Sequence, residues 1–132
     1  MANKLNLIDY DAAAAAKLAS FFAEADPAIR ELLPQIRIVQ DTWLVRALGQ
    51  GGVTMGTTIH LRGHFAKPPY TSFDRGLILA HECTHVGQYV RYGYLGFFAR
   101  LLWQMIRVLG YEATEIEQEA ERMENRFEAW HR

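Results

Sequence analysis

The chain has little cysteine, no excess of charge of either sign and no long uninterrupted apolar run. It holds one cysteine among 132 residues, so a secreted scaffold stabilised by internal disulfides is excluded. Fourteen Lys and Arg stand against 15 Asp and Glu, and a net charge of -1 disfavours binding to nucleic acid, which needs cations to neutralise phosphates. The longest apolar stretch, residues 95–109, contains Arg100 and Arg107 and is too short to span a bilayer.

A targeting signal is also lacking at the N-terminus, because Asp9 and Asp11 lie where a signal peptide would carry its apolar segment. We therefore expect a cytoplasmic protein, with export that needs no cleaved signal as the alternative. Half of the residues are hydrophobic and 12% are aromatic, which suffices for one core. The prediction is a single domain over residues 1–132.

Two helices are predicted near the start of the chain. Residues 9–24 are good helix formers, and Asp9 or Asp11 would be the N-cap. A second helix begins at Asp26 and Pro27 and ends before Pro34, since the residue ahead of a proline avoids helical backbone angles. Extended chain is predicted next, followed by a glycine-rich turn at residues 49–52. The residues that suggest this extended chain are Ile36, Ile38, Trp43, Leu44 and Val45.

The rest of the chain predicts one strand and three helices. Residues 53–61 alternate apolar and polar side chains, as a half-buried strand does, and residues 62–70 contain the glycine and prolines of a loop. Thr71 and Asp74 have the spacing of a capping box before a helix over residues 73–92. Two further helices are expected over residues 95–109 and 111–130. The predicted fold class is α+β, mostly helical with a small β-sheet.

The chemistry is concentrated in His81, Glu82 and His85, which form a His-Glu-x-x-His motif inside the predicted helix. Residues four apart lie on one helix face about 6 Å apart along the axis, so two imidazoles can converge on one zinc ion. Glu82, beside the first ligand, can reach a water on the metal and act as the general base in an attack on a carbonyl. A helix with two hydrogen-bonded histidines and a surface glutamate is the alternative.

A catalytic zinc ion usually has three protein ligands and one open position. A third histidine in the metzincin pattern is excluded, because Gln88 and Arg91 occupy the positions that the pattern gives to glycine and histidine. A glutamate from the last helix is the other solution. The candidates there are Glu112, Glu115, Glu117, Glu119, Glu121, Glu124 and Glu128.

The motif and its surroundings resemble the small minimal zincins of bacteria, which are gluzincin-like metallopeptidase domains, some of them associated with contractile injection systems. The resemblance covers about residues 53–121. It rests on the following residues: His81, Glu82, His85, Val86, Gln88 and Tyr89, then Tyr92, Gly93, Gly110 and Tyr111, and finally Glu117, Glu119 and Ala120. It implies a zincin-like fold in which the metal-site helix is preceded by an edge strand that pairs with an extended peptide.

The resemblance also implies that Glu117 is the third metal ligand, since it takes the place of the first glutamate in a Glu-x-x-Ala-Asp pattern. This chain has Glu121 where that pattern has aspartate, and one turn after Glu117 the side chain of Glu121 would accept a hydrogen bond from a ligand histidine. Glu119 is the second choice for the metal if the register slips. The small Ala120 would let the two helices approach closely.

Other residues have more open roles. Gln88 lies on the face of both histidines and either contacts the site or closes the helix, and Cys83 is expected in the core. Peptide hydrolysis needs a donor to the developing oxyanion, and Tyr111 is preferred because it lies in the resembling segment. The other candidate donors are His60, His64, Tyr70 and Tyr94.

The sequence thus predicts a zinc metalloendopeptidase, a hydrolase acting on a peptide or protein substrate. His81, His85 and Glu117 would bind Zn²⁺, while Glu82 and Tyr111 would be catalytic. The alternatives are a zinc-containing module that binds without turnover and a secreted effector protease. The helix over residues 95–109 is expected to be a core helix with a wet face or, because Trp103 shares its polar side with arginines, a contact with a membrane surface or a protein partner.

Overall fold

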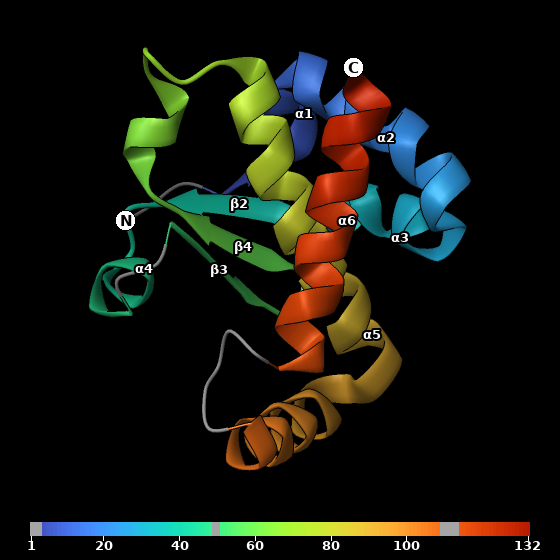
Figure 1. Cartoon of the computed structure of the whole chain (residues 1–132). Helices are drawn as coiled ribbons and strands as arrows, with labels where there is room; N and C mark the ends of the chain where they lie inside the picture. The colour runs from blue at the N-terminus through green and yellow to red at the C-terminus, as the bar shows by residue number, and fades with distance from the viewer. Residues whose placement is uncertain (1–3, 49–50, 109–113) are drawn as a thin grey trace.

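The computed structural model describes residues 4–48, 51–108 and 114–132, and it confirms an α+β fold that is mostly helical (Figure 1). Four short strands form one sheet in the order β1-β2-β4-β3, in which β2 and β4 are parallel and the other pairs are antiparallel. The strands are β1 (Leu5–Asn6), β2 (Arg37–Gln40), β3 (Gly52–Met55) and β4 (Thr58–Leu61). The α-helices are α1 (Leu7–Tyr10), α2 (Ala12–Ala25), α3 (Pro27–Leu32), α4 (Trp43–Ala47), α5 (Ser72–Val108) and α6 (Glu115–His131), with 3-10 turns η1 (Leu33–Gln35) and η2 (Gly63–Ala66).

The first predicted helix is divided in two. Asp11 has extended backbone angles between α1 and α2, and its carboxylate accepts the N–H of Ala14, so Asp11 and not Asp9 is the N-cap of the long helix. The predicted start of a helix at Asp26 and Pro27 is confirmed, because Asp26 accepts the N–H of Ile29. The same carboxylate of Asp11 also binds Arg75 of α5 at 2.7 Å, which ties the first long helix to the motif helix.

The extended chain expected after Pro34 is shorter than predicted. Strand β2 ends at Gln40, and Asp41 then takes a positive φ of 55° while its carboxylate accepts the N–H of Gly63. The following residues, from Trp43 onward, form the short helix α4, so the prediction of extended chain there was wrong. Side-chain apolarity at these positions did not distinguish a strand from a helical turn.

The strand predicted over residues 53–61 is a hairpin of two strands. Gly56 has a positive φ of 65° and begins a two-residue connection, so that Met55 pairs with Thr58. This pairing puts Thr54 on the same face as Ile59, and both are buried, whereas the single-strand prediction had placed them on opposite faces. The substrate-pairing role expected for this segment can apply only to β3, because β4 is an inner strand and β3 is one of the two edge strands of the described sheet.

Helix α5 contains two of the predicted helices. Thr71 and Asp74 make the predicted reciprocal capping contacts, since each backbone N–H binds the other's side chain. Gly93, with a φ of 72°, is the non-helical point at which the second half changes direction and projects below the body in Figure 1. Among the described residues, no helix combines the length and apolarity that crossing a membrane requires. The last helix begins at Glu115 after the N-cap Thr114, and the earlier part of its prediction, from residue 111, lies outside the described residues.

The main core lies between one face of the sheet and the helices α2, α3, α5 and α6. Ile38, Ile59 and Leu61 of the sheet pack against Leu79 and Cys83 of α5, so Cys83 is a buried core residue as predicted. A smaller cluster of Tyr89, Phe97 and Ile116 joins the region around the kink to the start of α6. Helix α5 therefore contacts most of the other elements, and its motif is held from several sides.

Asp11 provides a test of this packing. Asp11→Ala should lower the free energy of unfolding by about 1–2 kcal/mol at pH 7, because it removes the cap of α2 and the partner of Arg75. Burial raises the pKa of Asp11, but hydrogen bonds from Ala14, Arg75 and Ser72 outweigh it and hold the pKa below 3.8. The contribution is therefore complete above that pH and is lost as pH falls through the lowered pKa. Urea unfolding at pH 7 and pH 3 measures this difference.

The matched control is Asp9→Ala, because Asp9 is exposed and caps neither helix. Its effect should stay within about 0.5 kcal/mol at both pH values. An equal loss of stability in the two variants would contradict the assignment of the cap to Asp11.

Candidate metal centre

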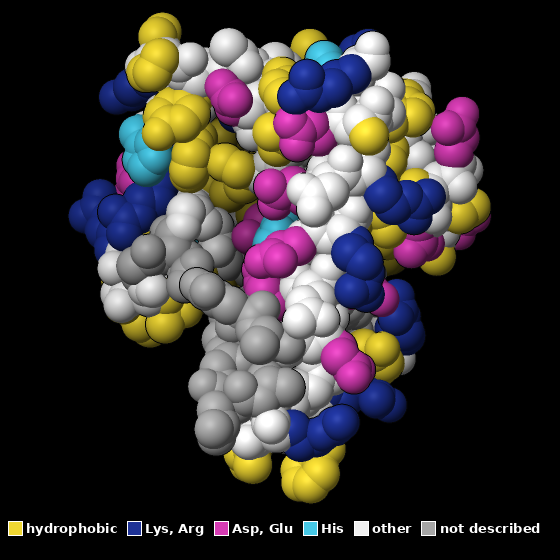
Figure 2. Space-filling model, in the orientation of Figure 1, with side chains coloured by type: hydrophobic (Ala, Val, Ile, Leu, Met, Phe, Trp, Pro, Cys, Tyr) yellow, Lys and Arg dark blue, Asp and Glu magenta, His cyan; other side chains and the backbone are white. Residues whose placement is uncertain are grey.

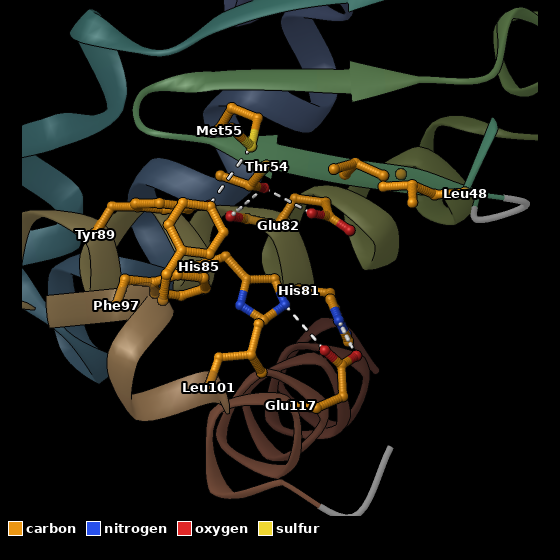
Figure 3. A pocket seen from close by; sticks show the side chains of 13 residues that line it. Leu48, Thr54, Met55, His81, Glu82, His85, Tyr89, Phe97, Leu101 and Glu117 are labelled. Atoms are coloured by element: carbon orange, nitrogen blue, oxygen red, sulfur yellow. Dashed lines mark hydrogen bonds and ion pairs between the residues drawn. The ribbon is translucent and has the colours of Figure 1, made fainter. Parts of the chain in front are cut away.

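Two histidines of α5 and one glutamate of α6 meet at the side of the sheet next to β3. His81 Nε2 lies 2.6 Å from Glu117 Oε1, and His85 Nε2 lies 3.2 Å from Glu117 Oε2 (Figure 3). One ligand atom from each of the three residues lies within 4.8 Å of the others. The four-residue helical spacing brings the two imidazoles together as predicted, and α6 supplies the carboxylate. These three residues lie close enough to hold a metal ion.

Glu117 lies in the first turn of α6, and the N-cap of that helix fixes its position. The Thr114 hydroxyl caps α6 by accepting the N–H of Glu117, in the first turn, where the helix dipole favours an anion. Burial raises the pKa of the Glu117 carboxyl, but the hydrogen bonds from His81 and His85 outweigh it, and the pKa is lowered below its usual range. Glu117 is therefore a carboxylate over the whole pH range in which the protein would work.

His81 is contacted by carboxylates at both ring nitrogens. Its Nδ1 lies 3.0 Å from Glu124 Oε1, two turns of α6 beyond Glu117, which contacts Nε2. Carboxylates accept hydrogen bonds and donate none, so both ring nitrogens carry protons in the metal-free protein. Burial lowers the pKa of His81, but the hydrogen bonds to Glu117 and Glu124 outweigh it and raise the pKa to about 10. A metal ion at Nε2 would take the place of one of these protons.

Gln88 fixes the orientation of His85. The Gln88 amide donates to the Ile116 carbonyl at 3.0 Å and to Glu119 at 2.9 Å, so its oxygen is an acceptor. That oxygen lies 2.8 Å from His85 Nδ1, which must therefore carry the proton. With Nδ1 bound to Gln88, Nε2 is the ring nitrogen that faces Glu117 and the metal position. Gln88 thus contacts the site, which decides between the two roles left open for it.

Glu82 lies across the cluster from α6, against strand β3. The Thr54 hydroxyl donates to Glu82 Oε2 at 2.6 Å and holds this carboxylate over the edge of the sheet (Figure 3). Its other oxygen, Oε1, lies beside Gly52, where an added Cβ would come within 3.0 Å of it. A glycine in β3 therefore leaves the space that the carboxylate occupies. Glu82 is buried and is not among the three residues whose ligand atoms converge.

All four residues line a cavity of about 300 Å³. Strand β3 borders it along Gly52–Met55, and aromatic and aliphatic side chains from the region of the kink form much of the remaining wall. These side chains are Tyr89, Phe97, Phe98 and Leu101, with Leu48 near α4. In Figure 2 a histidine is visible among acidic side chains in the hollow between the sheet side and α6, so the site opens to the surface. The arrangement is a small polar cluster in an apolar pocket, which is the usual form of a ligand site.

Residues 11–93 match the family model described as the eCIS core domain. The chain belongs to the eCIS core domain family. The match spans more than half of the chain and contains His81, Glu82 and His85, and it ends at Gly93, the kink of α5. Glu117 lies beyond the matched residues of this eCIS core domain. No curated protein and no solved structure matches the chain.

Not every predicted residue of this eCIS core domain lies at the cluster. Glu119, the second choice for the metal, binds Gln88 and lies 3.7 Å from Arg91. The hydrogen bond to a ligand histidine, predicted for Glu121, is made by Glu124, because the residue seven after Glu117 returns to the same helix face while Glu121 is exposed. Ala120 is fully buried where α5 and α6 approach.

Tyr111, the preferred oxyanion donor, lies outside the described residues. None of the other candidates is among the residues that line the cavity: His60 binds Thr42, His64 and Tyr70 pack around Phe65, and Tyr94 contacts Tyr89. Tyr89 does line the cavity, with its hydroxyl 3.7 Å from the Met55 sulfur. Burial is the main cause of the raised pKa of Tyr89, which therefore remains a hydrogen-bond donor at neutral and basic pH.

Sequence reasoning assigned no role to Thr54 or Tyr89, and it named Glu124 only as one of the candidate metal ligands. The spacing of seven between Glu117 and Glu124, and of four between His85 and Tyr89, was a usable signal, because each pair shares a helix face. Thr54 had no such signal, since its position depends on the hairpin turn at Gly56.

Glu124 and Glu121 form a matched pair for testing the contacts of the cluster. Glu124→Ala should weaken zinc affinity by about 10- to 100-fold, because it removes the acceptor that orients the ring of His81. Glu121→Ala should leave zinc affinity unchanged, since that side chain is exposed one turn away. Competition with a chromophoric chelator measures both constants. A larger effect of Glu121→Ala would show that the predicted register, and not the structure, is right.

Proposed function

We propose that this chain is a zinc metallopeptidase domain, with His81, His85 and Glu117 as the metal ligands and Glu82 as the general base. The observation that carries the proposal is the presence of Glu82 in the same cavity as the three convergent ligand atoms, held by Thr54 rather than by the cluster. A site that binds metal only for structure needs four ligands and no buried carboxylate beside them.

The donor set favours zinc over the common hard cations. Two imidazole nitrogens and one carboxylate oxygen suit zinc and related transition metals, whereas calcium and magnesium prefer oxygen ligands. Ligand atoms on a tetrahedral zinc ion lie about 3.3 Å apart, which is comparable with the contacts of 2.6 and 3.2 Å between the histidines and Glu117. The outer contacts of both histidines, to Glu124 and Gln88, support the same interpretation.

The residues of the cavity would divide the work of peptide hydrolysis. A bound zinc ion supplies a Lewis acid that polarises the peptide carbonyl and makes water more acidic. Glu82 would accept the proton of the attacking water at its carboxylate and pass it to the leaving amine, while the Thr54 hydrogen bond keeps that carboxylate in place. The Tyr89 hydroxyl is the described donor within the cavity that would serve a developing oxyanion.

Strand β3 gives the substrate a place to bind. It is an edge strand of the described sheet and borders the cavity with all four of its residues. An extended peptide added to this edge would pass next to Glu82 and the cluster. The apolar wall of Phe97, Phe98 and Leu101 would receive an apolar side chain of that peptide.

Metal content is the first measurement. Elemental analysis of the purified protein should find one zinc ion per chain in the wild type and none in His81→Ala. Glu117→Ala should lower zinc affinity far more than Glu119→Ala, because Glu119 acts only through Gln88. No metal in the wild type after zinc is supplied would refute the proposal, and the reverse order of the two glutamates would move the third ligand.

Glu82→Gln separates catalysis from metal binding. The amide keeps the size of the side chain and the contact with Thr54 but cannot accept a proton, so zinc should remain while hydrolysis falls by about 10²- to 10⁴-fold. The assay is cleavage of a pool of internally quenched peptides, with products identified by mass spectrometry. Zinc bound to a wild type that cleaves no peptide would favour the binding module without turnover.

A further inference from the structure

The second half of α5, residues 94–108, is here called the arm, and it exposes an unusual number of large apolar side chains. Leu95 is 87% exposed and Trp103 is 61% exposed. The same surface continues through several neighbours at helical spacing. These are Tyr94, Phe98, Leu102 and Ile106. An exposed apolar surface of this kind on one helix is typical of an interaction site.

The inner side of the arm is apolar as well and packs against the body of the protein. The exposed apolar side chains are therefore additional to those that the core needs. Phe97 is buried against Tyr89 and Ile116, and Leu101 packs on the same cluster. The packing expected of a core helix is thus provided by the inner side of the arm alone. Tyr94 and Phe98 contact Tyr89 at the margin of the exposed surface. The other large apolar side chains of that surface remain exposed in the part of the chain that the structure describes, namely Leu95, Leu102, Trp103 and Ile106.

Basic side chains flank this apolar face. Arg100 and Arg107 lie on the arm itself, Arg91 precedes it, and no acidic residue occurs between Glu82 and Glu112. Arg100 and Arg107 give the arm a charge of +2, which leaves -3 on the rest of a chain whose net charge is -1, so the arm opposes the charge of the rest. The Arg100 guanidinium lies 4.2 Å from the centre of the Tyr92 ring, which holds it beside the helix. Figure 2 shows yellow and dark blue side chains together at the lower end of the molecule.

We propose that the arm docks on the surface of an anionic lipid bilayer, with its axis in the plane of the interface. An apolar face rich in Leu, Phe and Trp with arginine at its margin is the composition of interfacial helices. Arginine provides attraction to anionic headgroups, and exposed Trp and Tyr favour the boundary between headgroups and acyl chains. The arm is about 22 Å long, too short to cross a hydrocarbon layer of about 30 Å, so it lies on the membrane.

A second copy of the chain fits this surface less well. A two-fold contact through the arm would bring Arg100 and Arg107 near the same residues of the other copy, where like charges repel. An anionic bilayer satisfies both features at once, the apolar face and its positive margin. Phe98 belongs to the exposed face and also lines the cavity, so docking would bring the cavity close to the lipid surface.

Vesicle flotation tests the proposal directly. The wild type should float with vesicles of phosphatidylcholine and phosphatidylserine in a 7:3 ratio, and much less with phosphatidylcholine alone. Arg100→Gln with Arg107→Gln should reduce partitioning by about 25-fold, or fivefold for each charge. Arg30→Gln with Arg126→Gln, at exposed positions away from the arm, should not change it beyond twofold. The experiment is done with EDTA, so its result is independent of metal binding and of the proposed peptidase activity.

Tryptophan fluorescence identifies the surface that inserts. Trp43→Phe retains Trp103 and Trp130, of which Trp130 packs on Phe21 and Phe127. The emission of this variant should shift to the blue on addition of the anionic vesicles, because Trp103 enters the bilayer interface. Trp103→Phe should lose that shift although Trp43 is even more exposed, and this conservative change of an exposed residue leaves the fold intact. Absence of vesicle binding, binding that persists in the arm variants, or a dimer in sedimentation velocity that Trp103→Phe dissociates would each overturn the proposal.

Discussion

The contact of one buried carboxylate with two histidines determines much of this structure. Glu117 joins α6 to α5 through His81 and His85, and the surrounding contacts of Gln88 and Glu124 run between the same two helices. Buried charged groups are costly unless they are paired, so the two helices can pack here only in the register that satisfies all of these partners. The position of the last helix is thereby linked to the position of the candidate metal ligands.

The fold was predictable where a local cause acts within a few residues. The capping box of Thr71 and Asp74 and the cap at Asp26 are local hydrogen bonds, and each begins a helix where the sequence placed it. The helix at Trp43 and the hairpin at Gly56 were not predictable from periodicity. Each depends on a change of chain direction at one or two residues. A shift of one residue in strand register moves every side chain of the strand to the opposite face of the sheet.

The candidate site was likewise predictable where residues close in sequence meet, and not where separate elements meet. Four-residue spacing on a helix was enough to bring His81 and His85 together, and the family resemblance pointed to the glutamate that the structure places beside them. Thr54 and the apolar wall could not be found in this way, because they come from a hairpin and from the chain beyond a kink. Contacts between elements depend on tertiary packing that no local pattern contains.

The kink at Gly93 divides the site between two stretches of chain. Before it lie the two histidines and Glu82, on the segment that matches the family model. After it lie Glu117 and the part of the cavity wall made by Phe97, Phe98 and Leu101. A fragment that ended at the kink would keep the motif and yet lack one of the three converging ligand atoms. The shape of this wall can therefore be altered at Phe97, Phe98 or Leu101 without changing the two histidines or Glu82.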